Sequence, residues 1–204
     1  MGIYSDVVLP RLCDLAMRNR RFLSYRERVT ALAEGNVLEI GSGSGLNLPL
    51  YGGSVREVVA LEPMPKLIAM AQPRARHGAL HVMFVEASAE AIPLESASVD
   101  AVVTTWTLCS IPDVVAALGE MRRVLRPRGR LLFVEHGLAP DAGVRRWQQR
   151  LTPAWRRISG GCHLDRPIAR LIDDAGFRMD KLTTGYMRGP RPMTWMYEGV
   201  AVRE

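Results

Sequence analysis

Residues 37–45 read VLEIGSGSG, a short apolar run followed by three glycines at alternate positions. A second apolar run, VVAL at residues 58–61, ends at the acid Glu62. A buried strand, a glycine loop that opens a helix and an acid that closes the next strand outline a nucleoside-cofactor site in a parallel α/β sheet. The glycines matter because they adopt positive φ and let the backbone come close to a ligand.

The charges around this loop indicate which cofactor would bind. The spacing is G-x-G-x-G rather than the dinucleotide pattern G-x-G-x-x-G, and Glu39 lies two residues before the first glycine. Its carboxylate would repel a pyrophosphate and attract an ammonium group, while Glu62 is placed to accept both hydroxyls of a ribose. S-adenosylmethionine has a ribose and an amino-acid end but no phosphate, so we expect this cofactor.

Composition limits the class of protein. With 204 residues, 48% of them hydrophobic, the chain can bury one core, and we expect a single domain over residues 1–204. The net charge is +6, but nearly all basic residues are arginines scattered among acids, so we expect no nucleic-acid partner. The first 30 residues mix charges throughout, which predicts neither a signal peptide nor a membrane span. Three widely separated cysteines suggest no disulfide framework, and a cytoplasmic protein is expected.

Apolar runs alternate with helical periods, which predicts a doubly wound α/β fold with a mostly parallel sheet. The expected helices cover 65–72, 113–125 and 166–175, and the expected parallel strands cover 37–40, 58–61, 81–85, 99–104 and 130–135. Residues 177–184 and 197–202 read as strands with no helix between them. The seven-stranded sheet should therefore finish in a C-terminal antiparallel hairpin.

Two further segments are expected to lie outside the sheet. Residues 3–33 have a helical period that Pro10 should break into two pieces and Gly35 should stop, and residues 1–34 are interpreted as a helical lid. Residues 137–165 are too long for an ordinary crossover loop and are interpreted as a partly helical cap insertion.

Five short motifs stand in the order and spacing of a known family. They are VLEIGSGSG at 37–45, LEP at 61–63, AEAIP at 89–93, SVD at 98–100 and RVLRPRG at 123–129. In these motifs the chain resembles the class I S-adenosylmethionine-dependent methyltransferases over nearly all of its length. With this resemblance, the expected cofactor-binding residues are Glu39, Gly41, Ser42, Gly43, Gly45, Asn47, Glu62, Pro63, Met64, Ser88, Ala89, Glu90 and Thr105. The acid that often precedes Ala89 in this family is Ser88 here, so the adenine contact should be weaker or made by backbone.

A narrower set of motifs resembles the methyltransferases that S-methylate alkyl thiols. It comprises LCS at 108–110, EH at 135–136, WQQ at 147–149, PAW at 153–155 and GCHL at 161–164. Relatives with similar cores methylate the amine of phosphatidylethanolamine or the ring carbon of quinone precursors, and both remain alternatives for the acceptor. The thiol enzymes often carry an N-terminal membrane anchor, which we do not expect here. A nucleotide-binding protein of the same fold and a NAD-dependent reductase are the alternatives outside the family.

His136 is the candidate proton acceptor. It follows the last expected parallel strand, at the carboxyl edge where ligands bind in open α/β sheets. A thiol has a reference pKa of about 8.5, so an imidazole that takes its proton or stabilises its anion would speed its methylation. The alternative is a structural histidine bonded to a neighbouring loop. Glu135 beside it is either a second proton acceptor or a hydrogen-bond anchor.

The acceptor is expected to be a small thiol or amine in an aromatic-rich pocket. The expected substrate residues are Tyr4, Trp106, Cys109, Trp147 and Trp155. Cys109 and Cys162 are either redox or arsenic ligands, as in some arsenite methyltransferases, or small buried apolar side chains; the second interpretation is favoured, and no metal is expected. The basic N-terminal helix is interpreted as a solvated lid face, with a weak contact to a membrane surface as the alternative.

Overall fold

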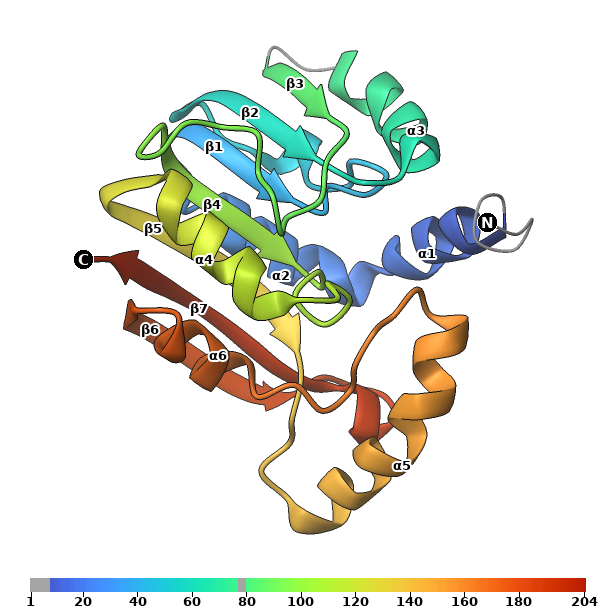
Figure 1. Ribbon diagram of the computed structural model, residues 1–204. Coiled ribbons are helices and arrows are strands. Elements are labelled where there is room, and N and C mark those ends of the chain that lie inside the picture. Colours follow the sequence, from blue (N-terminus) through green and yellow to red (C-terminus); the bar gives the residue numbers. More distant parts are fainter. Residues whose placement is uncertain (1–7, 77–79) are drawn as a thin grey trace.

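A seven-stranded sheet forms the centre of the computed structural model, which describes residues 8–76 and 80–204 (Figure 1). The strand order is β3-β2-β1-β4-β5-β7-β6. The strands are β1 (Gly35–Ile40), β2 (Val55–Leu61), β3 (His81–Val85), β4 (Val99–Thr105), β5 (Leu125–His136), β6 (Phe177–Tyr186) and β7 (Trp195–Arg203). Strand β7 pairs antiparallel with β5 and β6, while the other pairings are parallel, so the predicted C-terminal hairpin is confirmed.

Helices cover both faces of the sheet. They are α1 (Leu9–Met17), α2 (Arg20–Thr30), α3 (Pro65–Arg76), α4 (Val114–Val124), α5 (Ala142–Ile158) and α6 (Ile168–Asp174), with short 3-10 turns η2 (Leu48–Leu50) and η3 (Arg191–Met193). Figure 1 shows α4 and α6 in front of the sheet and α2 behind it. One hydrophobic core packs α4 and α6 against the sheet, and a second core packs α2 and α3 against the opposite face. The doubly wound α/β class is therefore confirmed.

Strand alternation decides which side chains reach which core. In β1, Leu38 and Ile40 belong to the core of α4 and α6, whereas Val37 belongs to the core of α2 and α3. Because side chains alternate along a strand, Glu39 points to the same face as Val37. After β1 the chain adds β2 and β3 along one edge of that strand, and β4 then pairs with its other edge. The crevice between β1 and β4 is therefore the switch point where open α/β sheets bind ligands.

The N-terminal helices are separated at a residue that the sequence analysis did not single out. Pro10 lies in the first turn of α1, where its missing N–H costs no hydrogen bond, and the helical piece predicted before it falls on residues outside the described part of the chain. The chain breaks at Asn19 instead, whose side chain caps α2 by accepting a 3.1 Å hydrogen bond from the Arg21 N–H. Helix α2 ends at Thr30, and Gly35 begins β1 rather than stopping a helix.

Helices α1 and α5 lie on the side toward which the parallel strands point (Figure 1). The turn after α5 packs closely on α1, because a Cβ placed on Gly160 would lie 3.2 Å from Leu9 Cδ2. The predicted cap over 137–165 is thus mainly helix α5. Helix α2 packs on β4, β5 and β7, and its Phe22 and Arg26 reach the cavity at the strand ends together with residues of α1. No helix in the described parts of the chain is long and apolar enough to cross a membrane.

Candidate functional site

The glycine loop after β1 is tied to the acid that closes β2. Glu62 accepts hydrogen bonds from the Gly43 N–H at 2.9 Å and from the Met64 N–H at 3.1 Å. Burial raises the pKa of Glu62 from its usual value, and the two backbone bonds oppose that rise. A carboxylate has about four acceptor positions, so two remain for the hydroxyls of a ribose.

The glycines of this loop have different structural roles. A Cβ on Gly41 would lie 2.4 Å from Thr107 Cγ2, so Gly41 allows the loop to pack against the segment after β4. A Cβ on Gly45 would lie 2.8 Å from Ala71 Cβ, which makes Gly45 a packing position. At Gly43 the nearest atom is the Gly41 carbonyl oxygen at 3.8 Å, so the space beside Gly43 is open to a ligand.

Glu39 lies at the centre of a buried polar cluster. Its carboxylate accepts from the Asn47 amide at 2.8 Å and from the Tyr51 hydroxyl at 2.9 Å. The Arg26 guanidinium donates to Asn47 Oδ1 at 2.7 Å and to the Thr105 hydroxyl at 3.2 Å. Burial raises the pKa of Glu39 to about 7, although its two hydrogen bonds and Arg26 oppose the rise. The cluster therefore presents a carboxylate and a guanidinium together beneath the glycine loop.

Arg26 is a site residue that sequence reasoning missed. The sequence predicts a solvated face for the basic N-terminal helix, but Arg26 is only 7% exposed. A signal was available: Arg26 lies between Phe22 and Val29 at helical spacing, on the face of α2 that packs against the sheet. A buried arginine on an apolar stripe indicates a partner.

Two unsatisfied polar atoms support the fit of the predicted cofactor. Arg26 Nε and Ser42 Oγ are buried and find no hydrogen-bond partner among residues 8–76 and 80–204. Both residues line the same cavity. Buried polar groups normally have partners, so these donors fit the carboxylate of an amino-acid ligand whose ammonium group faces Glu39.

The pKa of Glu39 makes cofactor affinity depend on pH. Below pH 7 the carboxyl is mostly protonated and attracts an ammonium group weakly, so the affinity for S-adenosylhomocysteine should rise about tenfold from about pH 6 to about pH 8. Calorimetry at several pH values measures this slope. Glu39→Gln should bind weakly with no such slope, whereas the exposed control Glu95→Gln should keep it. An equal slope in Glu39→Gln would contradict the assignment.

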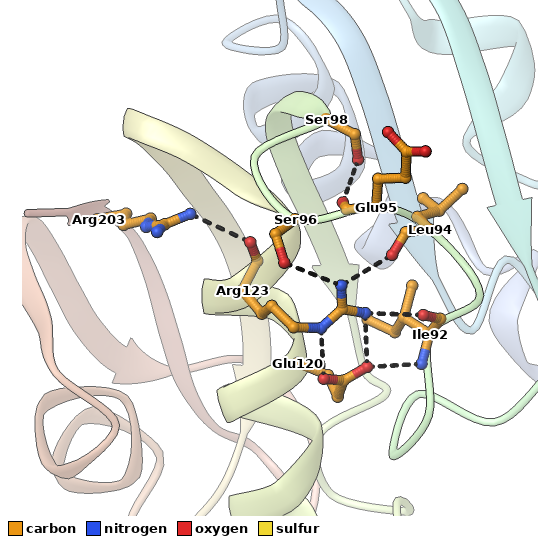
Figure 2. A network of polar contacts seen from close by, with 8 residues as sticks. All are labelled: Ile92, Leu94, Glu95, Ser96, Ser98, Glu120, Arg123 and Arg203. Carbon is orange, nitrogen blue, oxygen red and sulfur yellow. Dashed lines mark hydrogen bonds and ion pairs between the residues drawn. The ribbon is translucent and has the colours of Figure 1, made fainter.

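The loop after β3 is held by side chains of α4. Glu120 and Arg123 form a two-pronged ion pair at 2.7 and 2.8 Å, and Arg123 also donates to the Ile92 and Leu94 carbonyl oxygens, each at 2.8 Å (Figure 2). The Ile92 N–H donates to Glu120 at 2.9 Å, and the Arg203 guanidinium donates to the Arg123 carbonyl oxygen at 3.1 Å (Figure 2). This network fixes the segment that follows the predicted adenine-binding residues.

Those adenine-side residues take unequal roles. The Glu90 carboxylate accepts from the Ser88 hydroxyl at 2.6 Å and from the Asp113 N–H at 2.7 Å. Its oxygens therefore connect this loop to the start of α4, so Glu90 acts first as a loop anchor. Ala89 is buried between these two residues, and an adenine contact through backbone stays a prediction.

A cavity of about 380 Å³ opens at the carboxyl ends of β1, β4 and β5. Helix α1, the glycine loop, the segment after β4, helix α5 and the hairpin loop all contribute to its walls. Among the predicted cofactor residues, those that line it are Gly41, Ser42, Gly43 and Thr105. Among the predicted substrate and catalytic residues, those that line it are Trp106, Cys109, Trp155 and His136. The structure thus brings both predicted groups to one cavity.

Trp106 connects α2 to the end of β4. Its φ is +52°, an uncommon value for a bulky residue and one that is often found at functional sites. The indole meets the Phe22 ring edge-on with centroids 4.9 Å apart, and the Arg26 guanidinium carbon lies 5.1 Å from the ring centroid. Trp106 therefore helps to hold Arg26 at the wall of the cavity.

Several predicted residues lie elsewhere. Trp147 is 56% exposed, contacts Arg150 and is not among the described lining residues of the cavity, so its role as a substrate residue stays a prediction without support from its position. Tyr4 lies outside the residues that the structure describes. Pro63 is exposed at the start of the turn before α3, while Asn47 lies beneath the glycine loop as a bridge between Glu39 and Arg26.

Glu135 and His136 point to opposite faces of the sheet. Glu135 is fully buried and accepts from the Thr104 hydroxyl at 2.9 Å and from the Thr107 N–H at 3.0 Å. The described lining of the cavity includes His136 but not Glu135. Successive strand residues alternate, so both could not face one ligand. Of the two roles predicted for Glu135, its contacts favour the hydrogen-bond anchor, and its absence from the described cavity lining speaks against the proton acceptor.

His136 lies against two cysteines at the inner end of the cavity. Its Nε2 is 3.1 Å from Cys162 Sγ, and the ligand atoms of Cys109, His136 and Cys162 all lie within 4.8 Å of one another. The Cys109 side chain and burial raise the pKa of Cys162 far above its usual value. Burial lowers the pKa of His136, but the contact with Cys162 and the Glu135 carboxylate outweigh it and raise the pKa overall.

Comparisons with known proteins show the family of the chain. Residues 38–133 match a family model described as a methyltransferase domain. The chain is 34% identical over 188 residues to the thiol S-methyltransferase TMT1B of Homo sapiens, covering 89% of this chain and 75% of that protein. It is 35% identical over 119 residues to the demethylmenaquinone methyltransferase of Thermus thermophilus, covering 55% of this chain and 54% of that protein.

A solved structure of an S-adenosylmethionine-dependent methyltransferase from Thermotoga maritima has the same fold. Its TM-score is 0.71 at 20% identity, covering 99% of this chain and 98% of that chain. The fold, the glycine loop with its two acids and the matching relatives agree on one cofactor. The chain belongs to the class I S-adenosylmethionine-dependent methyltransferases.

Proposed function

We propose that this methyltransferase transfers the methyl group to the sulfur of a small hydrophobic thiol. The observation that carries the proposal is the position of His136 and two cysteines at the wall of an otherwise largely apolar cavity. The similarity to a thiol S-methyltransferase over most of the chain supports the same acceptor. The cofactor supplies an electrophilic methyl group on a positively charged sulfur.

The walls of the cavity suit such a reaction. Apolar side chains make up much of its lining, among them Met17, Phe22, Trp106, Leu164, Met187 and Met193. When a thiolate meets a sulfonium, their opposite charges cancel in the transition state, so a cavity of low polarity favours the transition state over the separated ions. Alignment of two bound reactants lowers the barrier by up to roughly 7–11 kcal/mol in favourable cases. The cavity residues therefore need to bind the two reactants, orient them and exclude water.

The remaining requirement is removal of the thiol proton. A free thiol with a pKa of about 8.5 is only a few per cent ionised at neutral pH. The His136 ring lies in the cavity wall, where it can hold that proton or stabilise the anion. The neighbouring carboxylate, Glu135, accepts from the Thr104 hydroxyl of β4 and from the Thr107 N–H, and it is not among the described lining residues.

A panel of acceptors tests the proposal. The full chain is incubated with methyl-labelled S-adenosylmethionine and with matched acceptors: an alkyl thiol, the corresponding alcohol and amine, a phosphatidylethanolamine and a demethylated quinol. We expect the thiol to be methylated at least about 100-fold faster than its alcohol, because the cavity supports a thiolate. Preferred methylation of the demethylated quinol or of an amine would overturn the thiol assignment; the shorter Thermus match is named a demethylmenaquinone methyltransferase.

A further inference from the structure

Three remote segments bring their sulfur and nitrogen atoms to one point of the cavity. Cys109 lies in the loop after β4, His136 ends β5 and Cys162 lies in the loop after α5. The two cysteine loops are joined by a 2.8 Å hydrogen bond from the His163 N–H to the Cys109 carbonyl oxygen. The Arg166 guanidinium also donates to the Leu108 carbonyl oxygen, so backbone contacts hold both cysteines in place.

The spacing of these atoms is close to that of a zinc site. Zinc–sulfur bonds of about 2.3 Å and zinc–nitrogen bonds of about 2.0 Å place tetrahedral ligand atoms roughly 3.5–3.8 Å apart. Here His136 Nε2 and Cys162 Sγ are 3.1 Å apart, and all three ligand atoms lie within 4.8 Å of one another. Small rotations of the two thiols would therefore complete the geometry.

We infer that Cys109, His136 and Cys162 bind one zinc ion as three protein ligands, with the fourth position open to the cavity. Two cysteines and one histidine are a ligand set found in catalytic zinc sites, in which water or substrate takes the remaining position. Thiolates and imidazole select zinc over the hard cations calcium and magnesium. All three residues line the cavity, so a ligand there can reach the ion.

The charge balance of the site is also suitable. Two thiolates and a neutral imidazole carry a charge of −2, which a zinc ion neutralises, and metal binding releases the thiol protons to solvent. Buried thiolates without a cation would be costly in this setting, where Cys109 is 2% exposed and Cys162 is 8% exposed. The ion would thus stabilise the buried cluster as well as its own ligands.

The open fourth position of the zinc ion would bind the acceptor thiol; this part of the inference rests on the proposed function. An acceptor thiol that coordinates there loses its proton to solvent and stays a thiolate at neutral pH. Its sulfur forms the bond to the methyl carbon while the bond from that carbon to the sulfonium sulfur breaks, and the electron pair stays on the departing sulfur. The products are a methyl thioether, which coordinates zinc weakly, and S-adenosylhomocysteine.

Zinc content and cobalt spectroscopy test the site without any turnover. The purified full chain is reconstituted with zinc chloride and desalted, and bound metal is measured by mass spectrometry. We expect about one zinc per chain, and Cys109→Ser and Cys162→Ser should each weaken zinc binding by more than about 100-fold. In the cobalt-substituted wild type, thiolate-to-cobalt charge-transfer bands should appear. An alkyl thiol should shift them, and the matching alcohol should not.

Matched controls keep the test specific. Cys13→Ser, which changes a third cysteine of the cavity wall, and His81→Gln, on exposed β3, should both keep the zinc of the wild type. The inference is overturned if the wild type retains no zinc, if Cys13→Ser loses as much as Cys109→Ser, or if intact protein carries a Cys109–Cys162 disulfide. Zinc binding without thiol turnover would refute only the proposed acceptor, and thiol turnover without zinc would refute only this site.

Discussion

Glu62→Ala is expected to lower the affinity for S-adenosylmethionine by about 10²–10⁴-fold. Each hydrogen bond from a ribose hydroxyl to the Glu62 carboxylate contributes about 1.5–3 kcal/mol, and two such bonds are lost. The variant also removes the acceptor of the Gly43 and Met64 N–H groups, which loosens the glycine loop. Calorimetry with S-adenosylhomocysteine measures the affinity, and circular dichroism checks that the fold is retained.

Gly43→Ala provides an independent test of the same site. The added Cβ meets no atom closer than the Gly41 carbonyl oxygen at 3.8 Å, so it projects into the space expected for the ligand. The positive φ of Gly43, +56°, costs an alanine about 1–2 kcal/mol of stability. We expect a loss of cofactor affinity of at least about tenfold while the protein still folds.

Gly176→Ala is the matched control. Gly176 also has a positive φ, +81°, but it lies between α6 and β6, away from the cavity. It should lose similar stability and keep wild-type affinity. Unchanged affinity in both Glu62→Ala and Gly43→Ala would refute the position of the cofactor. Equal losses in Gly43→Ala and Gly176→Ala would attribute the effect to stability alone.

The cofactor half of the site could be predicted because its determinants are local in sequence. Glu39 and the glycines occupy seven consecutive positions, 39–45, and Glu62 ends the next strand. Such a stretch shows directly that the backbone makes a tight turn and comes close to a ligand. The order of strands and helices along the chain follows from the alternation of apolar runs with helical periods. The doubly wound, mostly parallel sheet and its C-terminal hairpin were predicted for this reason.

The acceptor half depends on contacts between segments that are far apart in the sequence, and the sequence alone does not show which of them meet. Cys109, His136 and Cys162 come from three loops or strand ends that only the completed sheet brings together. Arg26 was missed because it stands among exposed arginines in α2, although its position on the buried stripe could have been recognised. The preference for Glu135 as an anchor could also have been recognised, since alternation along β5 excludes two adjacent residues from one face.

Pro10 gives a similar lesson about local rules. Proline ends a helix only where its missing N–H is needed, and the first turn does not need it. The period of the whole segment could not distinguish a break at Pro10 from one at Asn19. The capping contact of Asn19 with the Arg21 N–H decides the boundary, and it becomes visible only in the folded chain.

His136→Ala is expected to lower the methylation rate of an alkyl thiol by about 10²–10⁴-fold at neutral pH, the range that a positioned proton acceptor supplies. Much of this loss should return at alkaline pH. When the pH exceeds the thiol pKa of about 8.5, the thiol ionises without help, so the rates of the variant and the wild type should converge. The measurement is the pH dependence of turnover for both proteins, with His81→Ala on exposed β3 as the matched control.

The shape of the profile separates the candidate roles of His136. If His136 acts alone as a base, Cys109→Ser should keep a near-normal neutral rate; if it is one of three zinc ligands, Cys109→Ser should show the same neutral loss and the same alkaline recovery. An amine acceptor would give a profile that follows the ionisation of the amine in every variant. Parallel profiles for wild type and His136→Ala, with no recovery at alkaline pH, would mean that His136 only supports the fold and would remove the thiol proposal's proton acceptor.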